Sequence, residues 1–342
     1  SSALNKNTTG DFNIAVGSNA LCTNVTSDNN TAVGYFALKV NTAANNTAVG
    51  MNSLTSNTTG VGNVAVGALA LCTHTTGDDN TALGLCALIS NTTSSDNVAV
   101  GSCSLDANTT GDNNTAVGML SLSTNTTADN NTAVGRGAMK VNLTGASNVA
   151  VGKSSLENNT TADNNTAVGF ESLLTNTTGT QNTALGRTAL RSSTTSNDNV
   201  AVGFAALYTN TTGCQNTAVG SCALDSSSSG NANTALGYNV LTSNTSGANN
   251  IGVGALALDA NTTASNNTAV GYQSLSANTT GANNIGVGSC SMLSNTTGAS
   301  NISIGKVAMC SNTEGANNVA VGHIALRANT TADNNTAIGS SA

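Results

Sequence analysis

The sequence is poor in several residue types that most folds use. Of its 342 residues only 7% are charged and 2% are aromatic, and it contains neither proline nor tryptophan. A net charge of -7 is too dilute over this length to attract nucleic acid or an anionic membrane surface. No run of about 18 apolar residues occurs, so we expect no membrane insertion. Solubility must therefore come from asparagine, serine and threonine.

Titratable groups are too scattered to predict a catalytic centre. An enzyme brings acids, bases and nucleophiles together, but the two histidines, His74 and His323, lie far apart in the sequence. No carboxylate cluster recurs at short intervals, which argues against a carbohydrate-active enzyme. No Cys-x-x-Cys pair indicates a metal site. We expect no enzymatic activity, no cofactor and no metal ion, and we expect both histidines to be solvated.

What the chain does have is a pentapeptide, Asn-Thr-Ala-Val-Gly, which is intact at 114–118 and recurs with conservative variants. We number its glycine as coil position 0. These glycines lie 17 residues apart, with one interval of 16, and the consensus cycle is G-x-x-A-L-x-x-N-T-T-G-x-N-N-T-A-V. They are Gly17, Gly34, Gly50, Gly67, Gly84, Gly101, Gly118, Gly135, Gly152, Gly169, Gly186, Gly203, Gly220, Gly237, Gly254, Gly271, Gly288, Gly305, Gly322 and Gly339. A fixed short period is typical of a solenoid.

The repeat determines the predicted fold and domain organisation. Length alone would suggest two domains, but the coils of a solenoid contact only their neighbours and the array grows in one dimension. We predict an all-β fold, a parallel β-solenoid (β-roll) of about twenty 17-residue coils, in one continuous domain over residues 1–342. Ser1 and Ala342 both cut a repeat in mid-cycle, so we interpret the chain as a processed product or a segment of a longer array.

Coil positions 14 to 16 predict a short strand, because β-branched or aliphatic residues at 14 and 16 alternate with Ala, Gly or Ser at 15. We expect the two large side chains to fill the core and the small one to face an identical chain around a common axis. The glycine at position 0 then turns the chain with a backbone angle or a close approach that a side chain would forbid. A second short strand is expected at positions 3 and 4, as at Ala37 and Leu38.

Asparagine occupies position 13 in every copy of the repeat. In coils stacked about 4.8 Å apart, such side chains can hydrogen bond to one another and to turn carbonyls, as in cross-β arrays. We therefore predict a structural asparagine ladder. Its first members are Asn13, Asn30, Asn46, Asn63, Asn80, Asn97, Asn114 and Asn131.

Positions 1 and 5 are predicted to form the outward surface. They hold eight of the nine Lys and Arg residues, namely Lys39, Arg136, Lys140, Lys153, Arg187, Arg191, Lys306 and Arg327. Exposed aromatic rings at position 1 can stack on sugars or on a neighbouring fibre, although isolated exposed rings need no such explanation. These candidate surface contacts are Tyr35, Phe170, Phe204, Tyr238 and Tyr272.

Asn-x-Thr and Asn-x-Ser sequences recur at positions 7 and 12. In a eukaryotic or viral secreted context they predict glycosylation of surface turns. The alternative is that these asparagines serve turns and ladders, and that the acceptor pattern follows by accident. The candidate sites are Asn7, Asn29, Asn57, Asn108, Asn113, Asn159 and Asn278.

Cysteine and aspartate allow several interpretations. Cys86 and Cys103 share position 2 in neighbouring coils and are a candidate disulfide, although their Cβ vectors would be parallel. Links between chains and simple space filling are the alternatives for the cysteines.

Aspartates gather at positions 11 and 12, where they can act as turn formers or line a calcium ladder.

The strand and glycine unit, as in Asn-Val-Ala-Val-Gly at 97–101 followed by x-x-Ser-Leu at 102–105, resembles the head repeats of trimeric autotransporter adhesins. It is also similar to repeat arrays in the tail fibres of bacteriophages and other viruses. The resemblance covers essentially the whole chain, although the cycle here is longer by an inserted Asn-Thr-Thr-Gly. It implies a left-handed β-roll with three chains around one axis, located outside the cell on a cell or virion surface.

We predict a structural extracellular fibre segment, an adhesin head or stalk or a tail-fibre shaft, that builds a long stiff rod for surface attachment. Its partners would be further copies of the chain, in a homotrimer or filament, and cell-surface glycans or proteins. Ice binding is an alternative, because threonine ladders resemble ice-binding faces. Against it, Thr at position 14 exchanges with Val and Ile as a core residue would. A monomeric glycosylated extracellular filament subunit is a further alternative.

Overall fold

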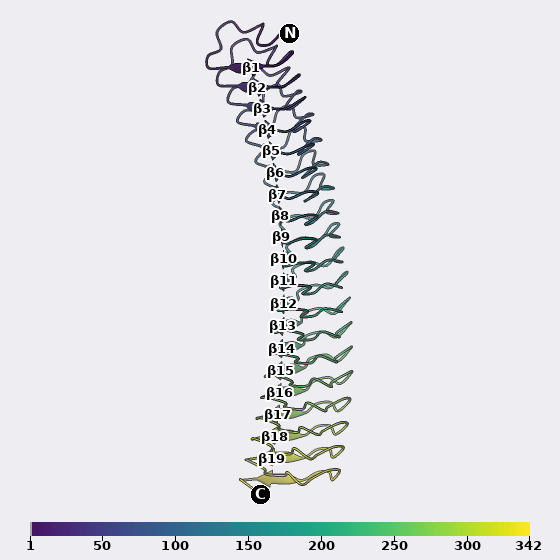
Figure 1. The fold of residues 1–342 in the computed structure, drawn as a ribbon. Coiled ribbons are helices and arrows are strands. Elements are labelled where there is room, and N and C mark those ends of the chain that lie inside the picture. The colour runs from purple at the N-terminus through teal and green to yellow at the C-terminus, as the bar shows by residue number, and fades with distance from the viewer. Residues whose placement is uncertain (1) are drawn as a thin grey trace. The chain divides into compact units, whose positions relative to one another are not determined.

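The computed structural model describes residues 2–342, and none of these residues lies in a helix. They fall into two compact units, one ending at Val168 and the other beginning at Gly169. Each unit is a parallel β-solenoid in which every coil contributes one three-residue strand at positions 14 to 16 (Figure 1). The predicted all-β solenoid of about twenty coils is confirmed.

Each unit holds ten strands. Those of the first unit are β1 (Ile14–Val16), β2 (Thr31–Val33), β3 (Thr47–Val49), β4 (Val64–Val66), β5 (Thr81–Leu83), β6 (Val98–Val100), β7 (Thr115–Val117), β8 (Thr132–Val134), β9 (Val149–Val151) and β10 (Thr166–Val168). Those of the second unit are β11 (Thr183–Leu185), β12 (Val200–Val202), β13 (Thr217–Val219), β14 (Thr234–Leu236), β15 (Ile251–Val253), β16 (Thr268–Val270), β17 (Ile285–Val287), β18 (Ile302–Ile304), β19 (Val319–Val321) and β20 (Thr336–Ile338).

Successive strands within a unit pair in parallel, with equal coil positions side by side. Ala116 of β7 lies beside Ala133 of β8, for example. The single 16-residue interval preserves this register, because Thr31 of β2 pairs with Thr47 of β3. The shorter coil therefore loses its residue in the turn and not in the strand, and the strand positions form continuous ladders within each unit.

The interior of a coil is built from five positions. In the coil that contains β8, Ser121, Leu122, Asn125, Asn131 and Ala133 occupy positions 3, 4, 7, 13 and 15, and each is 0% exposed. Leucine or methionine at position 4 supplies most of the buried apolar volume. The core of each coil is therefore one large aliphatic side chain, flanked by small residues and by two buried amides.

The expectation that positions 14 and 16 fill the core is wrong. Thr132 and Val134 lie on the outside of β8, where they are only half-buried. The reason is the narrow interior of a coil with one short strand. A Cβ atom added at Gly286, at position 15, would meet Ser274 Oγ at 2.7 Å and Leu275 Cδ1 at 3.3 Å. Only a small residue fits on the inner side of the strand.

The small residues at positions 3 and 15 face each other within one chain, and not a second chain as the sequence suggested. Ser291 and Ser303 occupy these two positions in one coil, and their hydroxyl oxygens lie 2.7 Å apart in a buried hydrogen bond. Both side chains are 0% exposed. An oligomer axis along these positions is therefore excluded.

Backbone geometry explains why glycine occupies position 0 and why the second strand, expected at positions 3 and 4, does not form. Gly118 has a φ of +130°, and a Cβ atom there would lie 2.6 Å from the carbonyl oxygen of Gly135 in the next coil. Both expected reasons for glycine at position 0 are confirmed. Positions 2 and 4 are left-handed, as in Phe36 (φ 59°) and Leu38 (φ 49°), so this segment curls and forms no strand.

Candidate functional site

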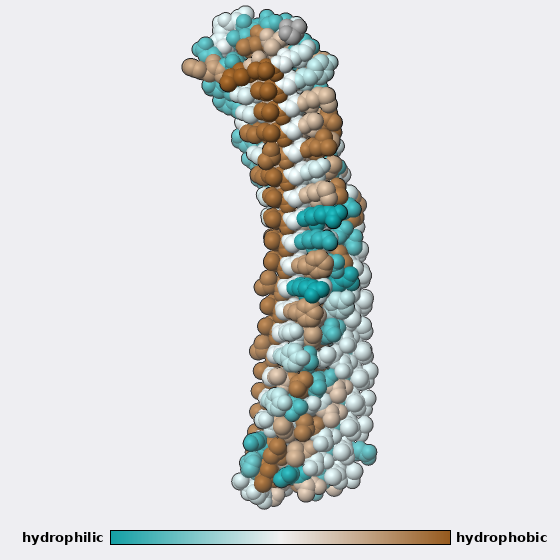
Figure 2. Space-filling model, viewed as in Figure 1, coloured by the Kyte–Doolittle hydropathy of each residue, from teal (hydrophilic) through white to brown (hydrophobic). Residues whose placement is uncertain are grey.

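The first candidate surface is the outer strand face, which we define as the side chains at positions 14 and 16 of β1 to β20. It holds only Thr, Val, Ile and Leu, and no charged residue. Several members are strongly exposed, including Leu83 (46%), Leu236 (47%) and Ile251 (42%). Figure 2 shows hydrophobic side chains stacked in a brown stripe along the strands. Within each unit, such a stripe of apolar side chains is typical of an interaction surface.

The second candidate surface is a groove with the same construction in both units. Side chains at position 1 form one wall, those at position 5 form the other, and those at position 2 form the floor. The groove deepens where long wall residues flank a small floor residue. One such hollow lies in each unit, and the two differ in chemistry.

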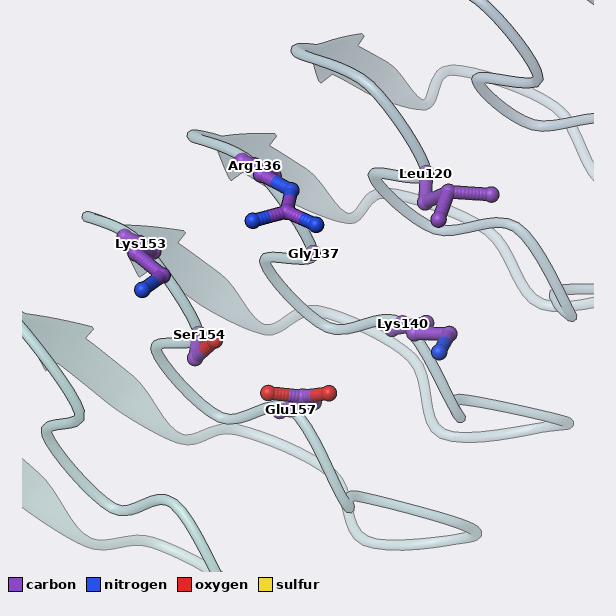
Figure 3. Close-up of a pocket in the computed structure, with 7 residues that line it drawn as sticks. All are labelled: Leu120, Arg136, Gly137, Lys140, Lys153, Ser154 and Glu157. Carbon is purple, nitrogen blue, oxygen red and sulfur yellow. The ribbon is translucent and has the colours of Figure 1, made fainter.

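The cationic hollow of the first unit has a volume of about 140 Å³. Figure 3 shows Arg136 and Lys153 on one side and Lys140 and Glu157 on the other, with Gly137 on the floor between them. Ser154 and Leu120 complete the lining. Three of the nine Lys and Arg residues of the chain therefore line this hollow, together with one carboxylate, that of Glu157.

The aromatic hollow of the second unit has a volume of about 320 Å³. Arg187 and Phe204 form one wall, and Tyr208 and Asp225 form the other. Burial raises the pKa of the Asp225 carboxyl above its ordinary value. The floor consists of Thr188, Ala205 and Cys222.

Ion pairing and ring contacts hold the side chains around the aromatic hollow. The Arg187 guanidinium carbon lies 5.9 Å from the ring centre of Phe170 and 5.7 Å from that of Phe204. Arg191 Nε donates a hydrogen bond to Glu171 Oε2 at 2.9 Å, and its guanidinium lies 5.8 Å from the Tyr208 ring centre. These contacts fix two arginines and three rings before any ligand arrives.

The five aromatic residues predicted as surface contacts are all exposed, by 38% to 57%. Phe204 lines the aromatic hollow and Phe170 adjoins it, whereas Tyr238 and Tyr272 line neither hollow. Tyr35 contacts Phe36, with ring centres 4.0 Å apart. The structure therefore brings only two of the five together.

Asparagines at position 13 form a hydrogen-bonded ladder. The backbone N–H of Asn131 donates to Asn114 Oδ1 at 3.0 Å, and Asn114 Nδ2 donates to the carbonyl oxygen of Ala128 at 2.8 Å. The same backbone-to-amide bond links Asn13, Asn30, Asn46, Asn63, Asn80, Asn97, Asn114 and Asn131 in succession. Each coil is thereby tied to the next through a buried amide.

Position 7 forms a second buried ladder, which removes the support for glycosylation there. Asn125 Nδ2 donates to Asn108 Oδ1 at 3.0 Å and to the Ala128 carbonyl oxygen at 3.0 Å. The predicted acceptors Asn57, Asn108, Asn159 and Asn278 are 0% exposed, and Asn7 is half-buried. The position 12 candidates Asn29 and Asn113 are exposed.

Aspartates at position 11 connect neighbouring coils. Asp112 Oδ1 accepts a hydrogen bond from the Ser95 backbone N–H at 2.7 Å, and Asp129 Oδ1 accepts one from Asp112 N–H at 2.7 Å. Among residues 2–342 no group of three His, Cys, Asp or Glu side chains is arranged to hold a metal ion. This geometry supports the turn-forming interpretation of these aspartates.

All eight cysteines are free thiols in the structure, including Cys86 and Cys103 of the candidate disulfide. Burial raises the pKa of the Cys86 thiol, and the adjacent Cys103 and Asp106 act in the same direction. Burial also raises the pKa of Cys72. Because the thiolate is the reactive form, a raised pKa lowers the reactive fraction of these two thiols.

The expectation that His74 is solvated is wrong, whereas His323 is exposed as expected. His74 replaces the position 7 asparagine and is 0% exposed, with Nε2 2.7 Å from the Gly77 carbonyl oxygen. A carbonyl oxygen can only accept, so Nε2 carries the proton. Burial lowers the pKa of the imidazole, and this effect outweighs the opposing contributions of the Gly77 hydrogen bond, Asn91 and Asp78.

We therefore expect the stability of the coil around His74 to fall on acidification. The unfolded state binds a proton near the ordinary histidine pKa of about 6.5, whereas the folded state resists it, so stability declines as pH falls below that value. His74→Asn restores the consensus residue and should remove this dependence. Urea unfolding of both proteins at pH 7.5 and pH 5 measures it. An equal loss in both proteins would assign the effect to other groups.

No protein-family model matches the chain, and no curated protein is significantly similar to it in sequence. Within residues 2–342 there is no helix with the length and hydropathy needed to cross a membrane. The similarity to adhesin heads and tail fibres therefore depends on the motifs alone and stays a prediction.

Proposed function

We propose that the chain is a structural segment of an extracellular fibre for surface attachment, and that copies of it associate through the outer strand face. The observation that carries this proposal is the outward orientation of the β-branched strand residues. In a monomer that faces water on all sides, polar residues would serve these positions equally well. None of the twenty strands carries a charged residue, whereas the chain is otherwise rich in Asn, Ser and Thr. This contrast favours contact between the outer strand face and another apolar surface.

A second copy of this chain suits the face best. Parallel in-register strands repeat the same side chains in each coil, so two such faces have the same spacing, about 4.8 Å. Identical partners related by a closed rotation bury the same patch on each copy. The adhesin-like motif supports three chains around the axis, with the outer strand faces and not the small residues at the centre.

The buried ladders support a mechanical role. Neighbouring coils of a unit are joined by strand pairing and by the amides at position 13, and in most coils an asparagine at position 7 adds to them. Buried hydrogen bonds are costly to break one at a time, because each leaves an unpaired polar group in the interior. Such a stack resists local opening, as a fibre under load requires.

Charge on the outer strand face is expected to abolish self-association. In Val117→Lys/Val134→Lys two lysines replace half-buried, outward-facing valines at position 16 of β7 and β8. Burying them against the same positions of another copy would desolvate like charges. The matched control, Thr110→Lys/Thr127→Lys, adds the same charge at exposed turn positions. Light scattering after gel filtration should give single chains for the first variant and the wild-type mass for the control. Equal masses for both variants would refute the proposed face.

Ice binding is the second candidate, and one observation now favours it. Position 14, where threonine is the commonest residue, faces outward beside position 16, so its exchange with Val and Ile does not mark a core residue. The outer strand face is thus a regular array of hydroxyl and methyl groups. Thermal hysteresis of the single-chain form tests this directly. Hysteresis that is lost in Val117→Lys/Val134→Lys would support ice binding, and its absence would reject it.

A further inference from the structure

We propose that the groove between coil positions 1 and 5 binds an acidic polysaccharide. The cationic hollow would hold a carboxylate or sulfate group, and the aromatic hollow would hold a sugar ring. Each hollow lies within one unit and forms a separate site. The proposal does not depend on self-association, because no residue of the groove belongs to the outer strand face.

The cationic hollow has the charge and the donors for an oxyanion. Arg136 and Lys140 form no ion pair with any residue in the described part of the chain. Arg136 is exposed and presents a planar guanidinium, which binds carboxylate and sulfate oxygens in pairs. Lys153 lies on the same wall as Arg136, and Ser154 contributes a hydroxyl (Figure 3). A basic cluster of this kind is unusual in a chain with a net charge of -7.

The floor of this hollow is open because of one glycine. A Cβ atom at Gly137 would meet nothing closer than Ser154 Oγ at 3.9 Å. The preceding coil has Leu120 at the same position, where its side chain fills this space. A volume of about 140 Å³ is smaller than the roughly 300 Å³ of a typical small-molecule pocket. It therefore fits one charged substituent of a larger ligand.

The aromatic hollow has the size and the walls for a sugar ring. Its volume of about 320 Å³ reaches the lower end of ligand pockets. Phe204 is 49% exposed and offers a ring edge or face to the apolar C–H side of a pyranose. Arg187 and Asp225 on the two walls can donate to and accept from its hydroxyl groups. Because Arg187 is held between Phe170 and Phe204, little side-chain freedom is lost on binding.

The groove favours a polysaccharide over a uniform polyanion such as nucleic acid. The position 5 wall also carries Asp106, Glu157, Asp225 and Asp259, which would repel a phosphate at every step. In a polysaccharide, charged substituents alternate with hydroxyls and apolar ring faces. A charged substituent matches the cationic hollow of the first unit, and a sugar ring matches the aromatic hollow of the second unit. Nucleic acid also requires a surplus of basic residues along its path, which the groove does not provide.

Calorimetric titration tests the proposal with three probes. They are an oligosaccharide in which uronate and neutral sugars alternate (the polyuronate), a neutral glucan of equal length and a poly-glutamate peptide of equal charge. We expect the wild-type chain to bind the polyuronate and not the glucan, with affinity that falls as NaCl rises from about 0.05 to about 0.5 M. Arg136→Gln/Lys140→Gln should weaken binding of the polyuronate to the cationic hollow, and Phe204→Ala/Tyr208→Ala its binding to the aromatic hollow, each by about tenfold or more. Because the hollows are separate sites, each double variant should leave binding at the other hollow unchanged. Circular dichroism verifies that the variants are folded.

Matched variants at the same coil positions elsewhere are the controls. Lys39→Gln and Tyr238→Ala/Tyr272→Ala should retain wild-type affinity for the polyuronate, because they line neither hollow. Absence of polyuronate binding, equal binding of the glucan, or an equal loss in the controls would overturn the proposal. Binding of poly-glutamate as tightly as the polyuronate would overturn it in favour of an acidic protein partner. The groove variants should have the same mass in sedimentation as the wild-type chain. Polysaccharide binding and self-association can therefore be refuted independently of each other.

Discussion

Replacement of Gly118 by alanine is expected to lower the free energy of unfolding by roughly 3 to 5 kcal/mol. The new Cβ atom would lie 2.6 Å from the Gly135 carbonyl oxygen, and the φ of +130° is strained for any side chain. Neither strain can relax alone, because the same glycine ladder continues into the coils above and below. Urea unfolding followed by circular dichroism measures the loss.

The control for this variant is Gly137→Ala, a glycine one coil away. Its φ is +66° and its new Cβ atom would have no neighbour closer than 3.9 Å. It should therefore cost about 1 kcal/mol, from the left-handed backbone alone. Equal losses at Gly118 and Gly137 would show that close stacking of the coils does not determine the glycine ladder.

Asn114→Ala is expected to lower the free energy of unfolding by about 2 to 4 kcal/mol. The backbone N–H of Asn131 would lose its buried acceptor, Asn114 Oδ1, and the missing amide would leave a small cavity. The Ala128 carbonyl oxygen would keep only its bond from Asn125 Nδ2. The same urea unfolding experiment measures this effect.

Its control is the preceding residue, Asn113→Gly, at exposed position 12. The φ of 58° at Asn113 suits glycine, and the side chain is in solvent, so stability should change by no more than about 0.5 kcal/mol. If both variants lost the same stability, the ladder of buried amides would contribute nothing beyond turn propensity.

The period of the sequence predicted the strand at positions 14 to 16, its register and the glycine turn, because a ladder in a solenoid depends only on spacing. The second strand expected at positions 3 and 4 does not form, because positions 2 and 4 are left-handed. It did not predict which side of the strand faces the core. Alternation at Thr132, Ala133 and Val134 identifies two faces but does not assign them, and β-branched residues usually face inward. The width of the coil decides the question, and that width follows from the left-handed turns at positions 2 and 4.

The walls of the groove were predictable from the sequence, since basic and aromatic residues gather at positions 1 and 5. The floor was not predictable. A small residue at position 2, such as Gly137 or Ala205, opens a hollow only where long side chains at positions 1 and 5 flank it. Tyr208 was missed because it lies at position 5, whereas the repeated aromatic residues that predicted surface contacts lie at position 1. Burial of His74 could have been inferred from its replacement of an asparagine present in most other coils.

The most direct test of the account is the mass of the wild-type chain by sedimentation equilibrium, with and without reductant. Association through the outer strand face predicts three chains in both conditions, since all cysteines are free thiols. A single-chain mass in both conditions would contradict the fibre assembly. If the mass were that of several chains without reductant and of one chain with reductant, disulfides between chains, and not the outer strand face, would account for the association.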